Sequence, residues 1–323
     1  MNAFRKIVIL TLVITSMALV IIGVSMKLMR SEKTIVGIVE EIFVLTGFLK
    51  FTVQSFTYSL LLVVLAIVIE YFAVGKEQST LQRLIRFNSK SLRADLFTWL
   101  LVHLGLFDFL FFLSTFGVFH YISSFVFNGL SIRIDHLISN TTLLACLVFV
   151  LSDLKNYLFH RIMHLRPFWE LHSFHHSATE FNVFTATRTH FLQKMVLILL
   201  DSIMYAMFQI PIEIFMGVTL FYQLLQYLHH SEVNWSFGWL GKWIILSPKA
   251  HRIHHSIQPE HYNKNFGSFF VIWDRLFGTF HSTNDQIHIG IPNNSYNQKG
   301  YVFDLWIGFK NFVLDGLKLM RLK

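Results

Sequence analysis

Two histidine triplets of identical spacing and one histidine pair most constrain how this 323-residue chain can fold. Eleven of its 17 histidines lie between His160 and His255. The pair and triplets read His160-Arg-Ile-Met-His164, His172-Ser-Phe-His175-His176 and His251-Arg-Ile-His254-His255. Residues three or four positions apart share a face of a helix, so each group can direct its imidazoles toward one point. The pattern is typical of a polynuclear metal site formed where separate segments converge.

The alternative role of these histidines is structural, because a lone histidine in apolar sequence usually makes hydrogen bonds in a core. One pair and two triplets in so short a stretch favour metal ligation instead. The one cysteine, Cys146, lies in an apolar run and can form neither an intrachain disulfide nor a thiolate cluster. Eight histidines exceed the three or four ligands of a tetrahedral ion, so their number favours two ions held close together. Spacing alone does not separate iron from zinc.

Composition places this site in a membrane protein. Hydrophobic residues make up 54% of the chain and charged residues 14%, and there are 35 phenylalanines. These proportions are far from those of a water-soluble domain and predict an integral membrane protein. The net charge of +8 comes from basic residues that flank apolar stretches, not from a dense basic tract. Anionic lipid headgroups are therefore the expected partner, and nucleic acid is not.

Four apolar stretches approach or exceed the roughly 20 residues that cross a bilayer. They cover residues 7–25, 51–74, 96–119 and 137–158. The first follows Arg5 and Lys6 as in a signal peptide, but no convincing cleavage site follows it, which favours an uncleaved anchor. The stretch 34–50 contains Glu40 and Glu41 and is expected to be an interfacial helix. The basic loop between the second and third spans belongs in the cytoplasm by the positive-inside rule.

The side of the membrane on which the histidines lie follows from this order of spans. The fourth span leads into His160, and four crossings from a cytoplasmic amino terminus return the chain to the cytoplasm. A further apolar block, 195–228, is broken by Pro211, whose ring and missing amide donor interrupt a helix. Its short halves predict a hairpin that enters and returns on one side, bringing His229 and His230 beside the first cluster.

The remaining segments complete the predicted architecture. The tryptophan-containing segment 235–246 is expected at the headgroup level, and 263–280 is expected to fold as a cap over the cluster. We predict an all-α fold, a polytopic membrane helical bundle of about four transmembrane helices plus a re-entrant or short helical hairpin, with a cytosolic histidine-rich helical cap. The chain is expected to form a single integral membrane domain, 1–323, with transmembrane anchors in 1–136 and a catalytic region in 137–285.

A family resemblance rests on strings that occur in order over residues 153–279. They are HRIMH, HSFHH, an isolated HS at His230, SPKAHRIHHS, NFG and WDRLFGT. Their arrangement resembles that of the fatty acid hydroxylase and sterol desaturase superfamily of membrane di-iron oxygenases. The resemblance implies a centre of two iron ions that uses dioxygen to hydroxylate or desaturate a C–H bond of a lipid. Fatty acyl, alkylglycerol, sterol-like and carotenoid lipids all fit as substrates.

The same resemblance implies a ligand set. Carried over residue by residue, the metal ligands are His160, His164, His172, His175, His176, His230, His251, His254 and His255. His190, in the string TATRTH, matches a family histidine usually followed by proline, but Phe191 follows here, so it is either a ligand or a neighbour that orients one. Adjacent helical residues point about 100° apart, so we expect His230 to be a ligand and His229 to be hydrogen-bonded beside it.

Other polar residues are candidates for orienting the ligands, because a metal-bound imidazole normally donates its second N–H to a carboxylate or carbonyl. Asp153 lies two turns before His160 on the same helix face and is expected to serve as such an anchor, since a carboxylate at membrane depth is costly unless it is used. The weaker candidates for this role are Asn182, Arg188, Asn265 and Asp274.

Electrons for dioxygen chemistry must come from another source. The sequence holds no glycine-rich dinucleotide fingerprint and no cysteine set for an iron–sulfur cluster. We therefore expect a separate electron-transfer partner, either a reductase system or a reduced pterin as in the alkylglycerol branch. Two alternatives are a polytopic metal-ion transporter, whose site would lie near the bilayer midplane, and a metal-holding family member that binds or isomerises lipid without oxygenase chemistry.

Overall fold

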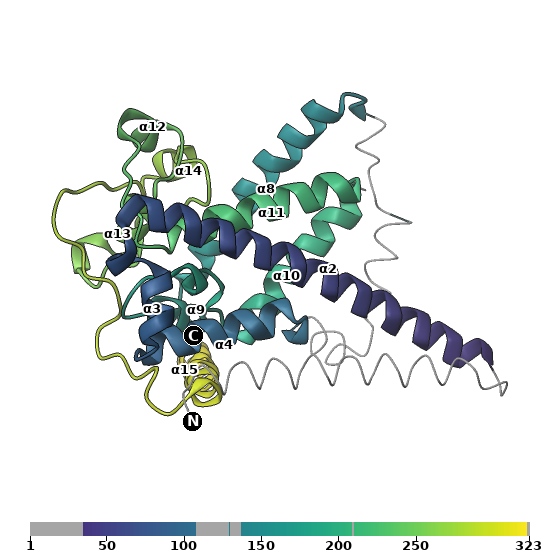
Figure 1. Ribbon diagram of the computed structural model, residues 1–323, viewed down its shortest axis with the longest axis horizontal. Helices are drawn as coiled ribbons and strands as arrows, with labels where there is room; N and C mark the ends of the chain where they lie inside the picture. The colour runs from purple at the N-terminus through teal and green to yellow at the C-terminus, as the bar shows by residue number, and fades with distance from the viewer. Residues whose placement is uncertain (1–34, 108–128, 130–136, 209, 322–323) are drawn as a thin grey trace. The chain divides into compact units, whose positions relative to one another are not determined.

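The computed structural model describes residues 35–107, 129, 137–208 and 210–321, except for the side chains of 35–51, 206 and 212 (Figure 1). The chain divides into two compact units, Met1–Thr57 and Tyr58–Lys323. Within the described residues every regular element is a helix, and extended pairing is limited to two isolated bridges, Ile245 with Phe270 and Ser256 with Ile289. The predicted all-α class is confirmed for this part of the chain.

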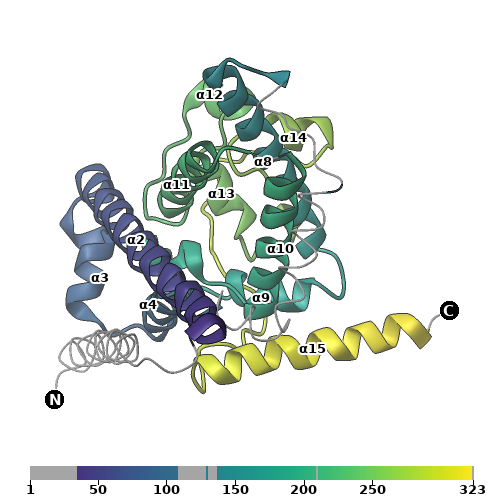
Figure 2. The ribbon, with the colours of Figure 1, turned by 90° about the vertical axis from the view of Figure 1, so that its right-hand side faces the viewer.

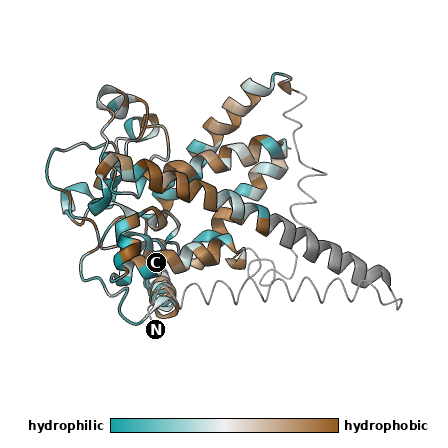
Figure 3. Cartoon of the chain, in the orientation of Figure 1, coloured by the Kyte–Doolittle hydropathy of each residue, from teal (hydrophilic) through white to brown (hydrophobic). Residues whose placement is uncertain are grey.

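Helix α2 (Ile35–Val74) contains a candidate membrane span, Thr52–Val74, close to the predicted 51–74. Its mean hydropathy is 2.2, and its described side chains are mostly hydrophobic (Figure 3). Phe72 is 82% exposed, which suits a helix that faces lipid better than one that faces water. Residues 35–50 of the segment predicted as an interfacial helix are helical and lie outside this span, but the helix runs on into the span without a break.

Three short helices follow α2: η1 (Lys76–Gln78), α3 (Thr80–Arg86) and α4 (Lys90–His103). Ser89 caps α4 by accepting a hydrogen bond from the amide of Leu92 at 3.3 Å. The predicted third span, 96–119, begins in the middle of α4. Its part beyond residue 107 lies outside the described residues, as does the whole of the first predicted span, 7–25.

Helix α8 (Thr141–Met163) is the second candidate span of the described residues. It starts where Asn140 accepts a hydrogen bond from the amide of Leu143 at 3.0 Å, and it continues past the predicted end at 158. The first histidine pair therefore belongs to the helix itself, with His160 in the last turn and His164 as the C-cap. The described part holds two helices long and apolar enough to cross a membrane, α2 and α8, which correspond to two of the four predicted spans. The other two, 7–25 and 96–119, lie wholly or mostly outside the described residues.

The predicted hairpin corresponds to α10 (Phe191–Phe208) and α11 (Ile212–His229). Pro211 stands at the N-cap of α11, where its missing amide donor leaves no helical hydrogen bond unmade. The rings of Tyr205 and Phe215, one from each helix, lie 5.5 Å apart. A cluster of buried apolar side chains packs this pair against α8; it consists of Leu144, Val148, Met204 and Ile210.

Six short helices follow or lie between these longer ones: α9 (Trp169–His176), η2 (Val183–Thr187), α12 (Gly238–Trp243), α13 (Pro248–His254), η3 (Pro259–His261) and α14 (Ile272–Leu276). The two histidine triplets lie on α9 and α13. Ser247 caps α13 by accepting from the amide of Ala250 at 3.1 Å, and Pro248 occupies the first turn, where its missing N–H costs nothing. The long helix α15 (Tyr301–Arg321) packs against α9 (Figures 1 and 2). Four segments thus bring histidines together: α8, α9, the end of α11, and α13.

Candidate metal centre

Nine histidines form two adjacent groups of ring nitrogens. We call them the five-histidine group (His160, His164, His172, His176 and His254) and the four-histidine group (His175, His230, His251 and His255). Within each group the potential ligand atoms all lie within 4.8 Å of one another. The rings of His176 and His255, one from each group, stack with centroids 4.2 Å apart, so the groups are direct neighbours. These are the nine residues that the sequence predicted as ligands.

Each triplet contributes to both groups. In α9, His172 and His176 are four residues apart and lie on one face, whereas His175 points to the other group. In α13, His254 joins the five-histidine group, and His251 and the following His255 join the four-histidine group. The spacing of each triplet therefore lets a single helix contribute imidazoles to both histidine groups.

Backbone carbonyls fix the ring orientation of several histidines. The Nδ1 atoms of His175, His230 and His254 lie 2.9, 2.8 and 2.7 Å from the carbonyl oxygens of Arg188, Gln226 and Lys264, respectively. Nδ1 of His160 lies 3.0 Å from the carbonyl oxygen of Phe266. A carbonyl oxygen only accepts, so Nδ1 must carry the proton in each ring and Nε2 presents a lone pair. This is the arrangement that imidazole ligands of metals commonly have.

The distances between Nε2 atoms test whether the residues fit a metal. Nε2 of His175 and Nε2 of His230 lie 3.2 Å apart, although both rings carry their proton on Nδ1. No hydrogen is available between them, so two lone pairs face each other and repel. Among the described residues, Nε2 of His160, His164 and His254 is buried without a hydrogen-bond partner, which is costly for a polar atom. A cation held by these nitrogens would remove both costs, so the donor set fits bound metal.

Burial also sets the protonation state of the groups. It lowers the pKa of His172, His175 and His255 well below the usual histidine value, and the neighbouring imidazoles add to the effect. A histidine must be neutral to ligate a metal. The rings are therefore competent ligands at neutral pH and remain so into mildly acidic conditions.

Asp274 supports the carbonyl that holds His160. Its carboxylate accepts hydrogen bonds from the amides of Phe266 and Gly267, at 2.8 and 2.9 Å, and from the hydroxyl of Thr279 at 2.7 Å. A Cβ atom at Gly267 would lie 2.9 Å from the Phe270 carbonyl oxygen and 3.0 Å from Oδ2 of Asp274, so the close packing favours glycine at this position of the NFG string. Asp274 thus orients His160 indirectly, through the backbone of Phe266.

Asp153 is placed differently from the prediction. It was expected to anchor His160, but seven residues separate the two along α8 by about 10 Å, which is beyond the reach of the carboxylate. Its oxygens instead accept from four donors at 2.8–3.0 Å, namely the amides of Phe269 and Phe270, the Trp273 indole and the Tyr222 hydroxyl. Asp153 therefore fastens the predicted cap segment 263–280 to α8.

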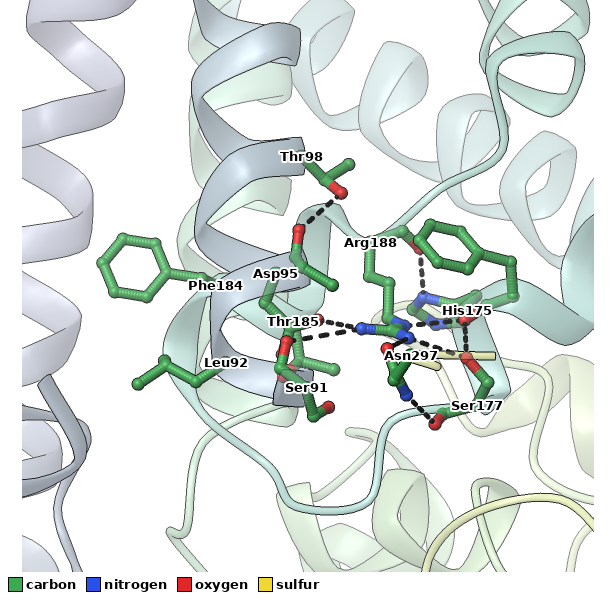
Figure 4. Close-up of polar contacts among 12 residues, drawn as sticks. Ser91, Leu92, Asp95, Thr98, His175, Ser177, Phe184, Thr185, Arg188 and Asn297 are labelled. Carbon is green, nitrogen blue, oxygen red and sulfur yellow. Dashed lines mark hydrogen bonds and ion pairs between the residues drawn. The ribbon is translucent and has the colours of Figure 1, made fainter. Parts of the chain in front are cut away.

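A buried ion pair beneath α9 holds the carbonyl that orients His175. Arg188 and Asp95 are both fully buried, and Nη1 of Arg188 lies 2.7 Å from Oδ1 of Asp95 (Figure 4). The guanidinium also donates to four other oxygen acceptors: the Phe174 carbonyl at 2.8 Å, the Ser177 hydroxyl at 2.8 Å, the Asn297 side chain at 2.5 Å and the Ser91 carbonyl at 3.5 Å. Arg188 was a weak candidate for orienting a ligand through its side chain, whereas in the structure its carbonyl accepts from His175.

Asn182 and Asn265 stabilise the backbone of segments near the site. Asn182 caps η2 through the amide of Phe184 at 3.0 Å and donates to Asp95 at 2.7 Å. Asn265 has a φ of 56°, in the left-handed region that asparagine tolerates, and donates to the Ala250 carbonyl at 3.0 Å. Neither side chain bonds to a histidine ring of the two groups within the described residues.

His190 and His229 lie outside both groups. Nε2 of His190 lies 2.9 Å from the carbonyl oxygen of Leu305, and its Nδ1 accepts from the amide of Leu192 at 3.1 Å, so both ring nitrogens are engaged. His229 donates to the Leu246 carbonyl at 3.1 Å and stacks on His251 with centroids 5.3 Å apart. The geometry agrees with the choice of His230 over His229.

Sequence reasoning missed two polar contacts of the site. Gln193 of α10 accepts from Nδ1 of His172 at 3.1 Å, and Asp95 of α4 pairs with Arg188. Asp95 had a partial signal, because it stands immediately before the apolar stretch that begins at residue 96, where a carboxylate is expensive unless it is paired. The local sequence around Gln193 carries no comparable signal.

Comparisons with known proteins agree with this geometry. Residues 145–279 match the family model described as Fatty acid hydroxylase. The matched segment, which is less than half of the chain, is similar to the fatty acid hydroxylase family and contains all nine histidines of the two groups. No solved structure matches the chain.

Three curated relatives illustrate the similarity. Alkylglycerol monooxygenase of Caenorhabditis elegans is 35% identical over 182 residues, which are 54% of this chain and 35% of that protein. The Homo sapiens alkylglycerol monooxygenase is 33% identical over 167 residues, 49% of this chain and 36% of that protein. An ornithine lipid hydroxylase of Rhizobium tropici is 32% identical over 134 residues, 41% of this chain and 40% of that protein. The matches thus span between about a third and two fifths of these relatives' lengths.

Proposed function

We propose that this protein is a membrane-bound, iron-dependent lipid hydroxylase. The observation that carries the proposal is the convergence of nine histidines in two adjacent nitrogen groups at the end of a candidate membrane span. Relatives named as a monooxygenase and a hydroxylase of lipids support hydroxylation over desaturation as the reaction. Alkylglycerols and amino-acid-containing lipids are the substrate classes that these names favour.

Two iron ions are the proposed cofactors, one for each group. Nine imidazoles exceed the needs of a single ion, and nitrogen-rich sites suit iron. Iron bound there would supply the redox chemistry by which dioxygen attacks an unactivated C–H bond. The chain's own part is to hold the imidazoles in position and to exclude water. Phe266 contributes to this, since its ring lies 5.7, 4.9 and 5.6 Å from the rings of His160, His164 and His254.

The location of the centre suits a lipid substrate. His160 lies in the last turn of α8, which is a candidate span, so the five-histidine group lies where a membrane-embedded acyl or alkyl chain could reach it. We propose about four crossings in all, with α10 and α11 as a hairpin that returns to one side. The centre then faces the cytoplasm, with anchors in 1–136 and the catalytic region in 137–285. A separate electron donor, a reductase system or a reduced pterin, completes the reaction.

The experiment compares lipid extracts of cells with and without the protein by mass spectrometry. The expected result is a lipid that gains one oxygen atom, labelled when the cells receive ¹⁸O₂, together with roughly two irons per purified chain by elemental analysis. His175→Ala and His254→Ala, one from each group, should abolish the product and reduce the iron content.

A matched control separates loss of metal from loss of folding. His288 is exposed and lies outside both groups, so His288→Ala should keep both product and iron. An unchanged lipid profile on expression, or product formation that survives both cluster substitutions, contradicts the hydroxylase proposal. Iron that exchanges freely with the medium during purification would point instead to metal-ion transport.

A further inference from the structure

Helix α15 turns its apolar side outward. Asp304 and Gly308 are buried against the protein, whereas Val302 is 78% exposed, Trp306 56% and Met320 67%. A helix on the surface of a water-soluble protein has the opposite arrangement, with its apolar stripe facing the core. A large exposed apolar stripe marks a surface that meets something other than water.

Six of the eight exposed large apolar residues of α15 form one continuous stripe: Val302, Trp306, Phe309, Val313, Leu317 and Met320. The other two, Leu314 and Leu319, lie outside it, one on each side. Successive members of the stripe are three or four residues apart, and at 100° per residue they fall within about 80° of one another around the helix. The stripe extends along nearly the whole of α15, whose 21 residues cover about 30 Å.

The inward side of α15 is fixed to the catalytic region. A Cβ atom at Gly308 would lie 3.0 Å from the Glu170 carbonyl oxygen and 3.1 Å from the His190 ring, so the helix approaches α9 closely. Asp304 accepts from the amide of Asn297 at 3.1 Å. With this side occupied, the stripe is the face of α15 that lacks a covering element among the described residues.

Basic residues flank the stripe on one side. Lys310 and Arg321 lie about 60° and 80° around the helix from its middle, and Lys318 lies further round on the same side, at about 140°. All three are exposed. An apolar stripe bordered by lysine and arginine is typical of helices that lie in the plane of a membrane surface, where the apolar side enters the acyl boundary and the cations meet phosphate groups.

Contacts with the segment that follows α8 place α15 near the end of that candidate span. Arg166 follows α8 by three residues, and its Nε lies 3.6 Å from Oδ2 of Asp315 in α15. The rings of Phe168 and Phe312 lie 5.9 Å apart. Since α8 is a candidate span, α15 is fastened to the stretch of chain that follows the end of that span.

We propose that α15 lies in the headgroup layer of a phospholipid bilayer, parallel to the membrane surface, with its stripe toward the acyl chains. The inference rests on membrane association of the chain and not on its catalytic activity. By packing against α9, a helix in this position would hold the HSFHH triplet at a fixed depth relative to the lipid.

Leu317 and Lys318 allow a matched test. They are neighbours in the chain, but Leu317 lies in the stripe and Lys318 is on its basic flank, 72% exposed at the side chain. In full-length protein with Cys146→Ser, each is replaced in turn by cysteine, Leu317→Cys or Lys318→Cys, and labelled with bimane. The proteins are placed in nanodiscs of phosphatidylcholine and phosphatidylglycerol, with or without doxyl-labelled lipid.

The expected result is several-fold stronger quenching by the doxyl lipid at position 317 than at 318, and the reverse order with aqueous iodide. Equal quenching by iodide at both positions would overturn the proposal, because the stripe would then face water. Protection of position 317 from both quenchers would also overturn it, in favour of a second copy or another protein on the stripe. Each labelled protein is accepted only if it elutes as the unlabelled parent does in size-exclusion chromatography.

Discussion

Asp95→Ala is expected to destabilise the protein strongly, although Asp95 belongs to neither histidine group. The substitution leaves the fully buried guanidinium of Arg188 without its charge partner. It also removes the acceptor of the Asn182 amide and the Thr185 hydroxyl, at 2.7 and 2.8 Å. Breaking a buried ion pair by removing one partner costs about 3–5 kcal/mol, because an uncompensated charge stays in a medium of low dielectric. At roughly 2–4 °C per kcal/mol, the midpoint of thermal unfolding should fall by about 10 °C.

The assay is thermal unfolding of the full-length protein in detergent, followed by tryptophan fluorescence, together with the metal content before heating. Because Arg188 also supplies the carbonyl that orients His175, the four-histidine group should lose metal when the ion pair is broken. Asp285→Ala is the matched control, since this carboxylate is exposed. A midpoint within about 2 °C of the control would show that Arg188 is adequately compensated by its four other acceptors, and the reasoning from the ion pair would be wrong.

Two further predictions concern the metal groups. Asp274→Ala leaves three buried hydrogen-bond donors unpaired, at a cost of about 1–3 kcal/mol each. It also frees the backbone of Phe266, whose carbonyl orients His160, so elemental analysis should show a loss of iron from the five-histidine group. An unchanged iron content would contradict the indirect role of Asp274. In the metal-free protein, burial holds the pKa of His172, His175 and His255 below the value of about 6.5 that histidine has in an unfolded chain. Below about pH 6.5 the unfolded chain therefore binds more protons than the folded protein does. The free energy of unfolding then falls as the pH falls, by up to about 1.4 kcal/mol per histidine and pH unit. The thermal midpoint with chelator present should therefore drop between about pH 7.5 and pH 5.5, and a midpoint that stays constant or rises would refute this assignment.

The histidines were the most predictable part of the site. Their spacing directs imidazoles to one side of short helices, and the family resemblance supplied His230, so all nine residues of the two groups could be identified before the fold was known. Pro211 likewise predicted the break between α10 and α11, because its backbone chemistry is local.

Contacts between distant segments were not predictable in the same way. Asp153 and His160 share a helix face, which suggested a direct interaction, but the carboxylate is satisfied by amides more than a hundred residues away. The pairing of Asp95 with Arg188 spans 93 residues, and no periodicity encodes it. The outward stripe of α15 was also missed, because an amphipathic pattern by itself does not say which face is turned to the protein.

The division of each triplet between the two histidine groups makes the halves of the centre interdependent. An altered tilt of α9 would move His172 and His176 in one group and His175 in the other at the same time, and the same holds for α13. Neither half can be repositioned or dismantled alone without disturbing its neighbour. A substitution that changes the tilt of either helix would therefore be felt in both groups, whereas changes in the surroundings of the centre can be confined to one of them.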